Sequence, residues 1–261
     1  RGEKYQTRVI IMPLQKLKLI FFLSIVVFSS ALIADNYPKK ILFIGNSYLY
    51  YNDSIHNHVK RMLIEHYSDS EIITKSATIG GSRLHNHNID HLLNPKNLQL
   101  TEQIDLLIMQ GGSGEVMTSK SRKIFSNTAK SYSDKAQAQG IKTALYMTHA
   151  YTKADRRYKE NLIERIAKTY YEAADLSNSL VIPVGEAYEI AYMENPNIEL
   201  HHPDGTHPGM LGTYLGAATV FAAITKTSPE GLKYNYLDRV SDKDRVFLQK
   251  VAWKAYQNSI L

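Results

Sequence analysis

Ile41-Leu42-Phe43-Ile44-Gly45-Asn46-Ser47-Tyr48 joins a continuous apolar run to a glycine turn. Four consecutive apolar residues closed by a glycine are typical of a strand that is buried on both faces, as in parallel sheets. A serine on the turn that follows is lifted off the sheet and lies near the positive end of the next helix. Ser47 is therefore a candidate nucleophile, although glycine beside serine is also common in ordinary turns.

The rest of the chain alternates short apolar runs with longer periodic segments. Asp53 or Ser54 is expected to cap the helix after the first strand. Strands separated by helices predict right-handed parallel crossovers and an α/β fold. We expect a three-layer α/β/α sandwich, flavodoxin-like, with about five parallel strands in the order 2-1-3-4-5. Further strands are expected at residues 72–77, 105–109, 141–147 and 180–184, and helices at 119–139, 155–176, 210–225 and 242–259.

The net charge of +6 is concentrated at the start of the chain. Residues 1–34 hold five basic and one acidic side chain, so the remainder carries 26 basic and 24 acidic residues. From Met12, two lysines precede the apolar run 19–28, which is typical of a secretory signal peptide. We expect cleavage after Ala31 or Ala34, or retention of the segment as an N-terminal membrane anchor. Residues 35–261 then form a single domain in the bacterial periplasm or outside the cell.

The absence of cysteine excludes disulfides, cysteine-ligated zinc and a thiol nucleophile. No stripe of basic and aromatic residues indicates nucleic-acid binding. His85, His87 and His91 form a histidine-rich stretch, but two residues of spacing would make His85 and His87 diverge on a helix. The sequence predicts no metal and no cofactor.

Three further loops carry polar residues; two follow predicted strands, at the edge where such sheets bind ligands, and the third precedes a predicted helix. The second strand runs into Gly80-Gly81-Ser82, and the third into Gln110-Gly111-Gly112-Ser113-Gly114. Near the end of the chain stands His201-His202-Pro203-Asp204-Gly205-Thr206-His207-Pro208-Gly209. A carboxylate at Asp204 can hold Nδ1–H of His207 and leave Nε2 free as a general base. Together with Ser47 these residues make a set of nucleophile, base and orienting acid.

We call the turn at Gly45-Asn46-Ser47, the loops after the second and third strands and the segment around Asp204 and His207 blocks one to four. In the order of these blocks the chain resembles the SGNH hydrolase superfamily, the GDSL-like serine esterases, over roughly residues 39–226. The resemblance implies Ser47 as nucleophile, His207 as base and Asp204 as acid. It also implies oxyanion donors at the backbone N–H groups of Ser47 and Gly81. The third block lacks the usual asparagine and looks more like the Gln-Gly-Glu form of sialate O-acetylesterase-like members, with Gly112 in place of the glutamate. Gln110 is then the candidate side-chain donor, with Ser113 as the fallback, and Asn46 stands where many members carry aspartate.

The resemblance implies hydrolysis of carboxylic esters by acyl transfer. For an exported enzyme we expect removal of small acyl groups such as acetyl from carbohydrate. Action on longer acyl chains, as a lipase or thioesterase, and a non-catalytic carbohydrate-binding relative of the fold are the alternatives. The expected partner is a small-molecule or carbohydrate ester, and a membrane is contacted only through an uncleaved N-terminal segment.

Overall fold

Strand β1 is flanked by two other strands in a five-stranded parallel sheet with the order β2-β1-β3-β4-β5. The computed structural model describes residue 2 and residues 37–260, so the predicted signal segment lies outside the described residues. The sheet confirms the predicted fold class and strand order. Its strands are β1 (Lys40–Gly45), β2 (Ile73–Thr78), β3 (Leu106–Gln110), β4 (Lys142–Tyr146) and β5 (Leu180–Ile182).

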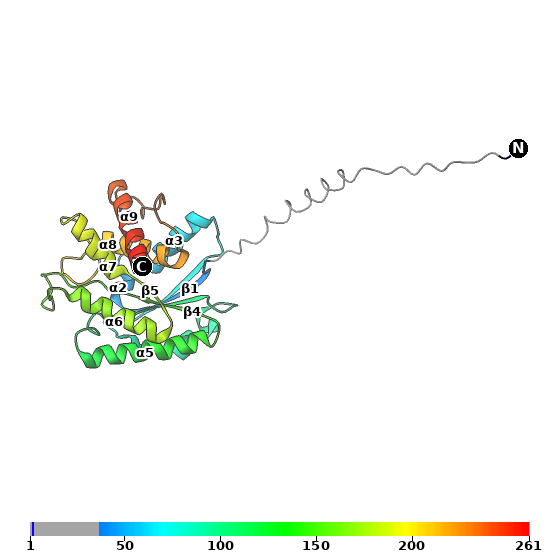
Figure 1. The fold of residues 1–261 in the computed structure, drawn as a ribbon, viewed down its shortest axis with the longest axis horizontal. Helices are drawn as coiled ribbons and strands as arrows, with labels where there is room; N and C mark the ends of the chain where they lie inside the picture. Colours follow the sequence, from blue (N-terminus) through cyan, green and yellow to red (C-terminus); the bar gives the residue numbers. More distant parts are fainter. Residues whose placement is uncertain (1, 3–36, 261) are drawn as a thin grey trace. The chain divides into compact units, whose positions relative to one another are not determined.

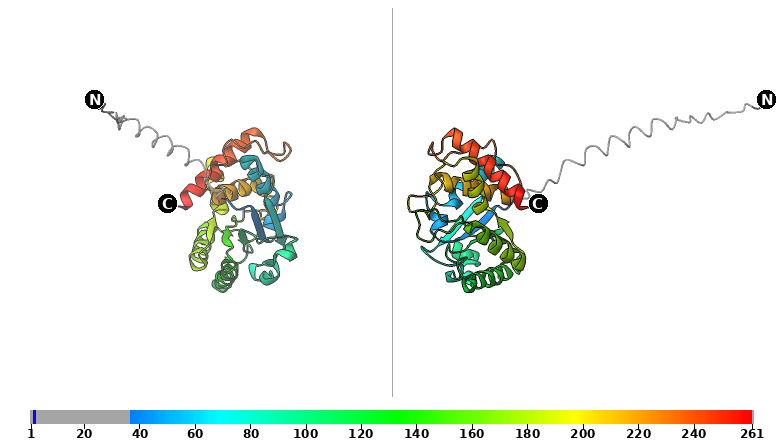
Figure 2. Two further views of the ribbon diagram at one scale, coloured as in Figure 1. Left: turned by 90° about the vertical axis from the view of Figure 1, so that its right-hand side faces the viewer. Right: turned by 60° about the vertical axis from the view of Figure 1, so that its left-hand side comes forward.

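Helices cover both faces of this sheet (Figures 1 and 2). Helices α3, α7, α8 and α9 pack on one face, and α5 and α6 pack on the other. Within residues 37–260 no helix has both the length and the apolar character needed to cross a bilayer. The helices are α2 (Ser47–Tyr50), α3 (Ile55–Tyr67), α4 (Ile89–Leu92), α5 (Ser119–Gln137), α6 (Leu162–Ser177), α7 (Val184–Glu194), α8 (Met210–Thr225) and α9 (Asp242–Ser259), with 3₁₀ turns at Leu84–Asn86 and Pro95–Leu98.

The apolar run in β1 supplies both hydrophobic cores, because successive side chains of a strand point to opposite faces. Ile41 and Phe43 lie in the core beneath α3 and α8. Leu42 and Ile44 lie in the core beneath α5 and α6. All four side chains are buried, which explains why the run contains no polar residue.

Most expected boundaries differ from the structure by one or two residues, and two of the differences are informative. The helix expected from residue 155 begins at Leu162, because the Asp155 carboxylate accepts hydrogen bonds from the backbone and the guanidinium of Arg157 and holds this segment as a loop. The strand expected to end at Val184 ends at Ile182, and Pro183 then precedes the unpredicted helix α7. The first of these errors matters for the site, since Arg157 lies on the loop rather than on a helix.

The central position of β3 predicts a large cost for truncating its side chains. Leu107 is fully buried between β1 and β4, so Leu107→Ala is expected to lower the free energy of unfolding by about 2–5 kcal/mol. The control Lys142→Ala removes an exposed side chain from the neighbouring strand and is expected to change it by less than about 0.5 kcal/mol. Urea denaturation followed by circular dichroism measures both values. Equal effects of the two substitutions would contradict the burial of β3.

Candidate active site

Ser47 lies where β1 gives way to the short helix α2. The preceding residue, Asn46, has an extended backbone, and its side-chain oxygen accepts a hydrogen bond from the backbone N–H of Tyr48 at 3.1 Å. This N-terminal cap ends the strand and starts the helix within one residue. Ser47 is consequently the first helical residue and stands at the carboxyl end of the sheet, as its sequence context predicted.

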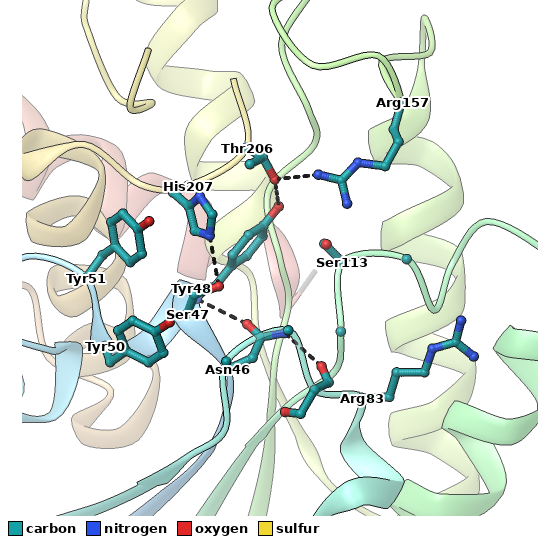
Figure 3. Close-up of a pocket in the computed structure, with 15 residues that line it drawn as sticks. Asn46, Ser47, Tyr48, Tyr50, Tyr51, Arg83, Ser113, Arg157, Thr206 and His207 are labelled. Carbon is teal, nitrogen blue, oxygen red and sulfur yellow. Dashed lines mark hydrogen bonds between the residues drawn. The ribbon is translucent and has the colours of Figure 1, made fainter. Parts of the chain in front are cut away.

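The structure brings Ser47, His207 and Asp204 together. Nε2 of His207 lies 2.9 Å from Oγ of Ser47, although the two residues are 160 positions apart in the chain. On the other side of the ring, Nδ1 lies 2.6 Å from Oδ2 of Asp204. The three side chains thus form a continuous chain of hydrogen bonds. Figure 3 shows the link between Nε2 of His207 and Oγ of Ser47.

The Asp204 carboxylate is held in its ionised form. Partial burial by itself raises the pKa of this carboxyl group, but the hydrogen bond with the His207 ring and those from the backbone N–H groups of Thr206 and His207 outweigh burial and hold the pKa below its ordinary value. An ionised carboxylate at Nδ1 fixes the tautomer in which Nε2 can accept a proton. Tyr51 also stacks on the His207 ring, with centroids 4.2 Å apart and planes within 5°, and so restricts its rotation.

A second histidine supports the loop that carries His207. His149 is buried between the rings of Tyr48 and Tyr188, with both centroid distances at 4.4 Å. Its Nε2–H donates to the backbone carbonyl of Thr206 at 2.7 Å, and burial lowers its pKa well below the ordinary value. His149 is therefore a neutral structural residue that orients the segment just before the candidate base.

Two backbone N–H groups are free to bind an oxyanion. Those of Ser47 and Gly81 form no hydrogen bond within residues 37–260, and both residues line the same pocket. Gly81 has φ = +68°, a left-handed conformation that glycine adopts without a steric cost. Donors of this kind stabilise the negative charge of a tetrahedral intermediate.

Gln110 does not occupy the place that the family resemblance implied. Its side chain is 1% exposed and does not line the pocket. Oε1 accepts from the backbone N–H of Asn46 at 2.8 Å, and Nε2 donates to the carbonyl of Gly111. Oε1 thereby positions the nucleophile turn, while Nε2 is bonded within the loop after β3, and Asn46 and Ser113 themselves line the pocket.

Glu115 is a residue that the sequence analysis missed. Its carboxylate is buried, and Oε2 accepts hydrogen bonds from the backbone N–H groups of Gly112, at 2.5 Å, and Leu84, at 3.4 Å. Burial raises the pKa of Glu115, and these two N–H groups oppose that effect. The carboxylate ties the loop after β2 to the loop after β3. An acidic residue directly behind a glycine-rich strand end was the available sequence signal.

The pocket in front of Ser47 has a volume of about 510 Å³. Its 15 lining residues come from the loops that follow β1, β2, β3 and β4 and from the Thr206–His207 segment (Figure 3). None of them has an aliphatic side chain; they are glycine, aromatic, hydroxyl, amide, arginine and histidine residues. In the part of the chain that the structure describes, no group of three His, Asp or Glu side chains is placed to hold a metal ion.

Comparison with known proteins gives a fold relationship. No family model and no curated protein matches the chain. A DUF4886 family protein from Bacteroides uniformis superposes with a TM-score of 0.67 at 19% identity, over 84% of this chain and 94% of that chain. A protein from Slackia heliotrinireducens assigned to the SGNH hydrolases gives 0.53 at 25%, over 70% and 97%. An acetyl xylan esterase gives 0.54 at 18%, over 71% and 99%.

The fold is therefore that of the SGNH hydrolase superfamily, which confirms the resemblance seen in the sequence. Solved structures that share it also include a lipase/acylhydrolase. On this fold the chain places a serine, a histidine and an aspartate in one hydrogen-bonded series at the carboxyl edge of the sheet.

The buried position of Glu115 leads to a stability prediction. Glu115→Ala leaves the N–H groups of Gly112 and Leu84 without an acceptor, so the free energy of unfolding is expected to fall by about 1–3 kcal/mol. Glu160→Ala, at an exposed glutamate, is the control and should change it by less than about 0.5 kcal/mol. Urea denaturation compares the two, and an unchanged midpoint for Glu115→Ala would show that its carboxylate does not join the loops.

Proposed function

We propose that this chain is an exported serine hydrolase that removes small acyl groups, such as acetyl, from a carbohydrate ester. The observation that carries the proposal is the hydrogen-bonded series Ser47–His207–Asp204, with Nε2 of His207 at 2.9 Å from Oγ of Ser47. A non-catalytic relative of the fold has no need to retain this alignment. Export rests on the pattern of residues 16–34 alone.

In the proposed reaction Oγ of Ser47 attacks the acyl carbon while Nε2 of His207 accepts the hydroxyl proton. The C=O oxygen becomes an oxyanion, which the N–H groups of Ser47 and Gly81 bind. Asn46 supplies a third donor, because among residues 37–260 only one hydrogen of its Nδ2 has a partner, the carbonyl of Ser82 at 2.9 Å. His207 then protonates the leaving alcohol oxygen as the C–O bond breaks.

A water molecule completes the cycle. His207 takes one proton from the water, the hydroxide adds to the acyl carbon of the Ser47 ester, and the proton passes to Oγ as the acid leaves. Asp204 stays ionised throughout and stabilises the imidazolium. These steps are carried by side chains and backbone N–H groups of the chain itself.

The lining of the pocket supports a short acyl group and a polar substrate. A long acyl chain needs an apolar groove, and no aliphatic side chain lines this pocket. The rings of Tyr50 and Tyr51 stand at one side of it, and Tyr50 is exposed enough to stack on a sugar (Figure 3). The similar fold of an acetyl xylan esterase adds support to the acetyl-carbohydrate assignment.

Replacement of the nucleophile tests the proposal. Ser47→Ala is expected to lower kcat for p-nitrophenyl acetate by at least about 10⁴-fold, because no other group of the series can form the acyl intermediate. Ser131→Ala removes an exposed hydroxyl from α5 and serves as the control with wild-type activity. Equal rates for wild type and Ser47→Ala would refute the serine mechanism, and faster cleavage of octanoate than of acetate would replace the deacetylase assignment with a lipase.

The orienting acid gives a second test. In Asp204→Asn the amide oxygen can keep the bonds from the N–H groups of Thr206 and His207, but an NH₂ group then faces Nδ1. This favours the tautomer with the proton on Nε2, which cannot accept a proton from Ser47. We expect kcat to fall by about 10³–10⁴-fold while the melting temperature changes little. Retention of more than a tenth of the wild-type kcat would argue against this role for Asp204.

A further inference from the structure

Two arginine side chains line one side of the pocket in front of Ser47. Arg83 and Arg157 are among the 15 lining residues, and none of the 15 is an aspartate or glutamate. Arg83 follows the glycine loop after β2, and Arg157 lies on the loop after β4. Figure 3 shows both guanidinium groups on the side where Ser113 lies, opposite Tyr50 and Tyr51.

Arg157 is held rigidly toward the pocket. Nε donates to Oδ1 of Asp155 at 2.9 Å and Nη2 to Oδ2 at 2.6 Å, while Nη2 also donates to Oγ1 of Thr206 at 3.2 Å. The guanidinium stacks 4.2 Å over the ring of Tyr151. The Asp155 side chain is 8% exposed and that of Arg157 is 41% exposed, so the carboxylate lies behind a guanidinium that faces outward. The two hydrogens on Nη1 of Arg157 have no partner within residues 37–260.

Arg83 has a fixed backbone and an unpaired guanidinium. Its N–H donates to Oδ1 of Asn86 at 2.8 Å, and its carbonyl accepts from the N–H of Asn86 at 3.0 Å. Among the described residues the guanidinium makes no hydrogen bond or ion pair. Glu115, a carboxylate whose pKa Arg83 lowers through space, is buried and directed at the N–H groups of Gly112 and Leu84. The positive charge of Arg83 is therefore available to a ligand.

We propose that the substrate of this site is an ester that carries a carboxylate, which Arg83 and the Nη1 edge of Arg157 bind. This inference rests on the proposed function and names its substrate class. Guanidinium groups bind carboxylates through paired, charge-assisted hydrogen bonds, so two of them in the lining of one pocket favour an anionic substrate. The carboxylate has two possible sources: the acyl part, as in a half ester of a dicarboxylic acid, or the alcohol part, as in an acetylated uronic acid.

Matched ester pairs separate the two sources. The acyl arm compares p-nitrophenyl hemisuccinate with p-nitrophenyl butyrate, which has the same number of acyl carbons. The alcohol arm compares O-acetylated methyl glucuronide with O-acetylated methyl glucoside. In one arm the anionic member is expected to have at least about tenfold higher kcat/KM, mainly through KM, and this preference should shrink as salt is added.

Substitution of Arg83 tests whether its guanidinium causes the preference for the anionic ester. Arg83→Gln is expected to lower the anionic-to-neutral ratio of kcat/KM by about tenfold, and Arg83→Lys to retain part of it. Arg156→Gln is the matched control, because this exposed arginine next to Arg157 does not line the pocket and should leave the ratio unchanged. Equal kcat/KM for both members in both arms, or an equal loss from Arg156→Gln, would overturn the proposal.

A binding measurement keeps this result separate from the proposed hydrolysis. In Ser47→Ala, calorimetry with succinate and with glucuronate is expected to detect saturable binding of one of them, weakened about tenfold when Arg83→Gln is added. Glucose should bind more weakly than glucuronate. Ser47-dependent hydrolysis without anion binding would overturn the inference alone, whereas anion binding without any Ser47-dependent hydrolysis would overturn the proposed function alone.

Discussion

The hydrogen bonds of Asn46 join the ends of three neighbouring strands, and the site depends on them. The backbone N–H of Asn46 binds Gln110 at the end of β3, and its Nδ2 binds the carbonyl of Ser82 beyond β2. Its Oδ1 caps the helix that starts at Ser47. One residue at the end of β1 therefore sets the position of the nucleophile relative to the loops that carry Gly81 and Gly112.

Small residues are required where these loops approach one another. A Cβ added to Gly45 would collide with the side chain of Gln110, and one added to Gly112 would lie 2.8 Å from the carbonyl of Ser82. The glycines at the strand ends thus permit close contact between loops, in addition to any turn that they form. The same close contact lets the buried carboxylate of Glu115 accept hydrogen bonds from N–H groups of the loops after β2 and β3, and so holds these two sides of the pocket together.

The sequence predicted the parts of the structure that depend on local pattern. Apolar runs such as Ile41–Ile44 identified the strands, and their alternation with helices predicted a parallel sheet between two layers of helices; the strand order came with the flavodoxin-like prediction. The proximity of Ser47 and His207 also followed, because both stand at strand ends or in loops at one edge of the sheet. The place of Gln110 could not be predicted, since its partner Asn46 is 64 positions away and an amide serves equally well in a pocket or in a core. The late start of α6 depends on the Asp155–Arg157 contact, which competes with a helix without changing the periodicity.

The residues next to the candidate nucleophile and base hold Ser47 and His207 in position relative to each other. Tyr48 follows Ser47, Thr206 precedes His207, and the Tyr48 hydroxyl and Thr206 Oγ1 lie 2.8 Å apart. His149 reinforces this link from behind by stacking on Tyr48 while it donates to the carbonyl of Thr206. Arg157 donates to the same Thr206 hydroxyl, so the side chain that we propose to bind the substrate carboxylate is connected to the segment that carries the base. A substrate anion bound at Arg157 is therefore connected, through Arg157 and the Thr206 hydroxyl, to the hydrogen bonds that align Ser47 with His207.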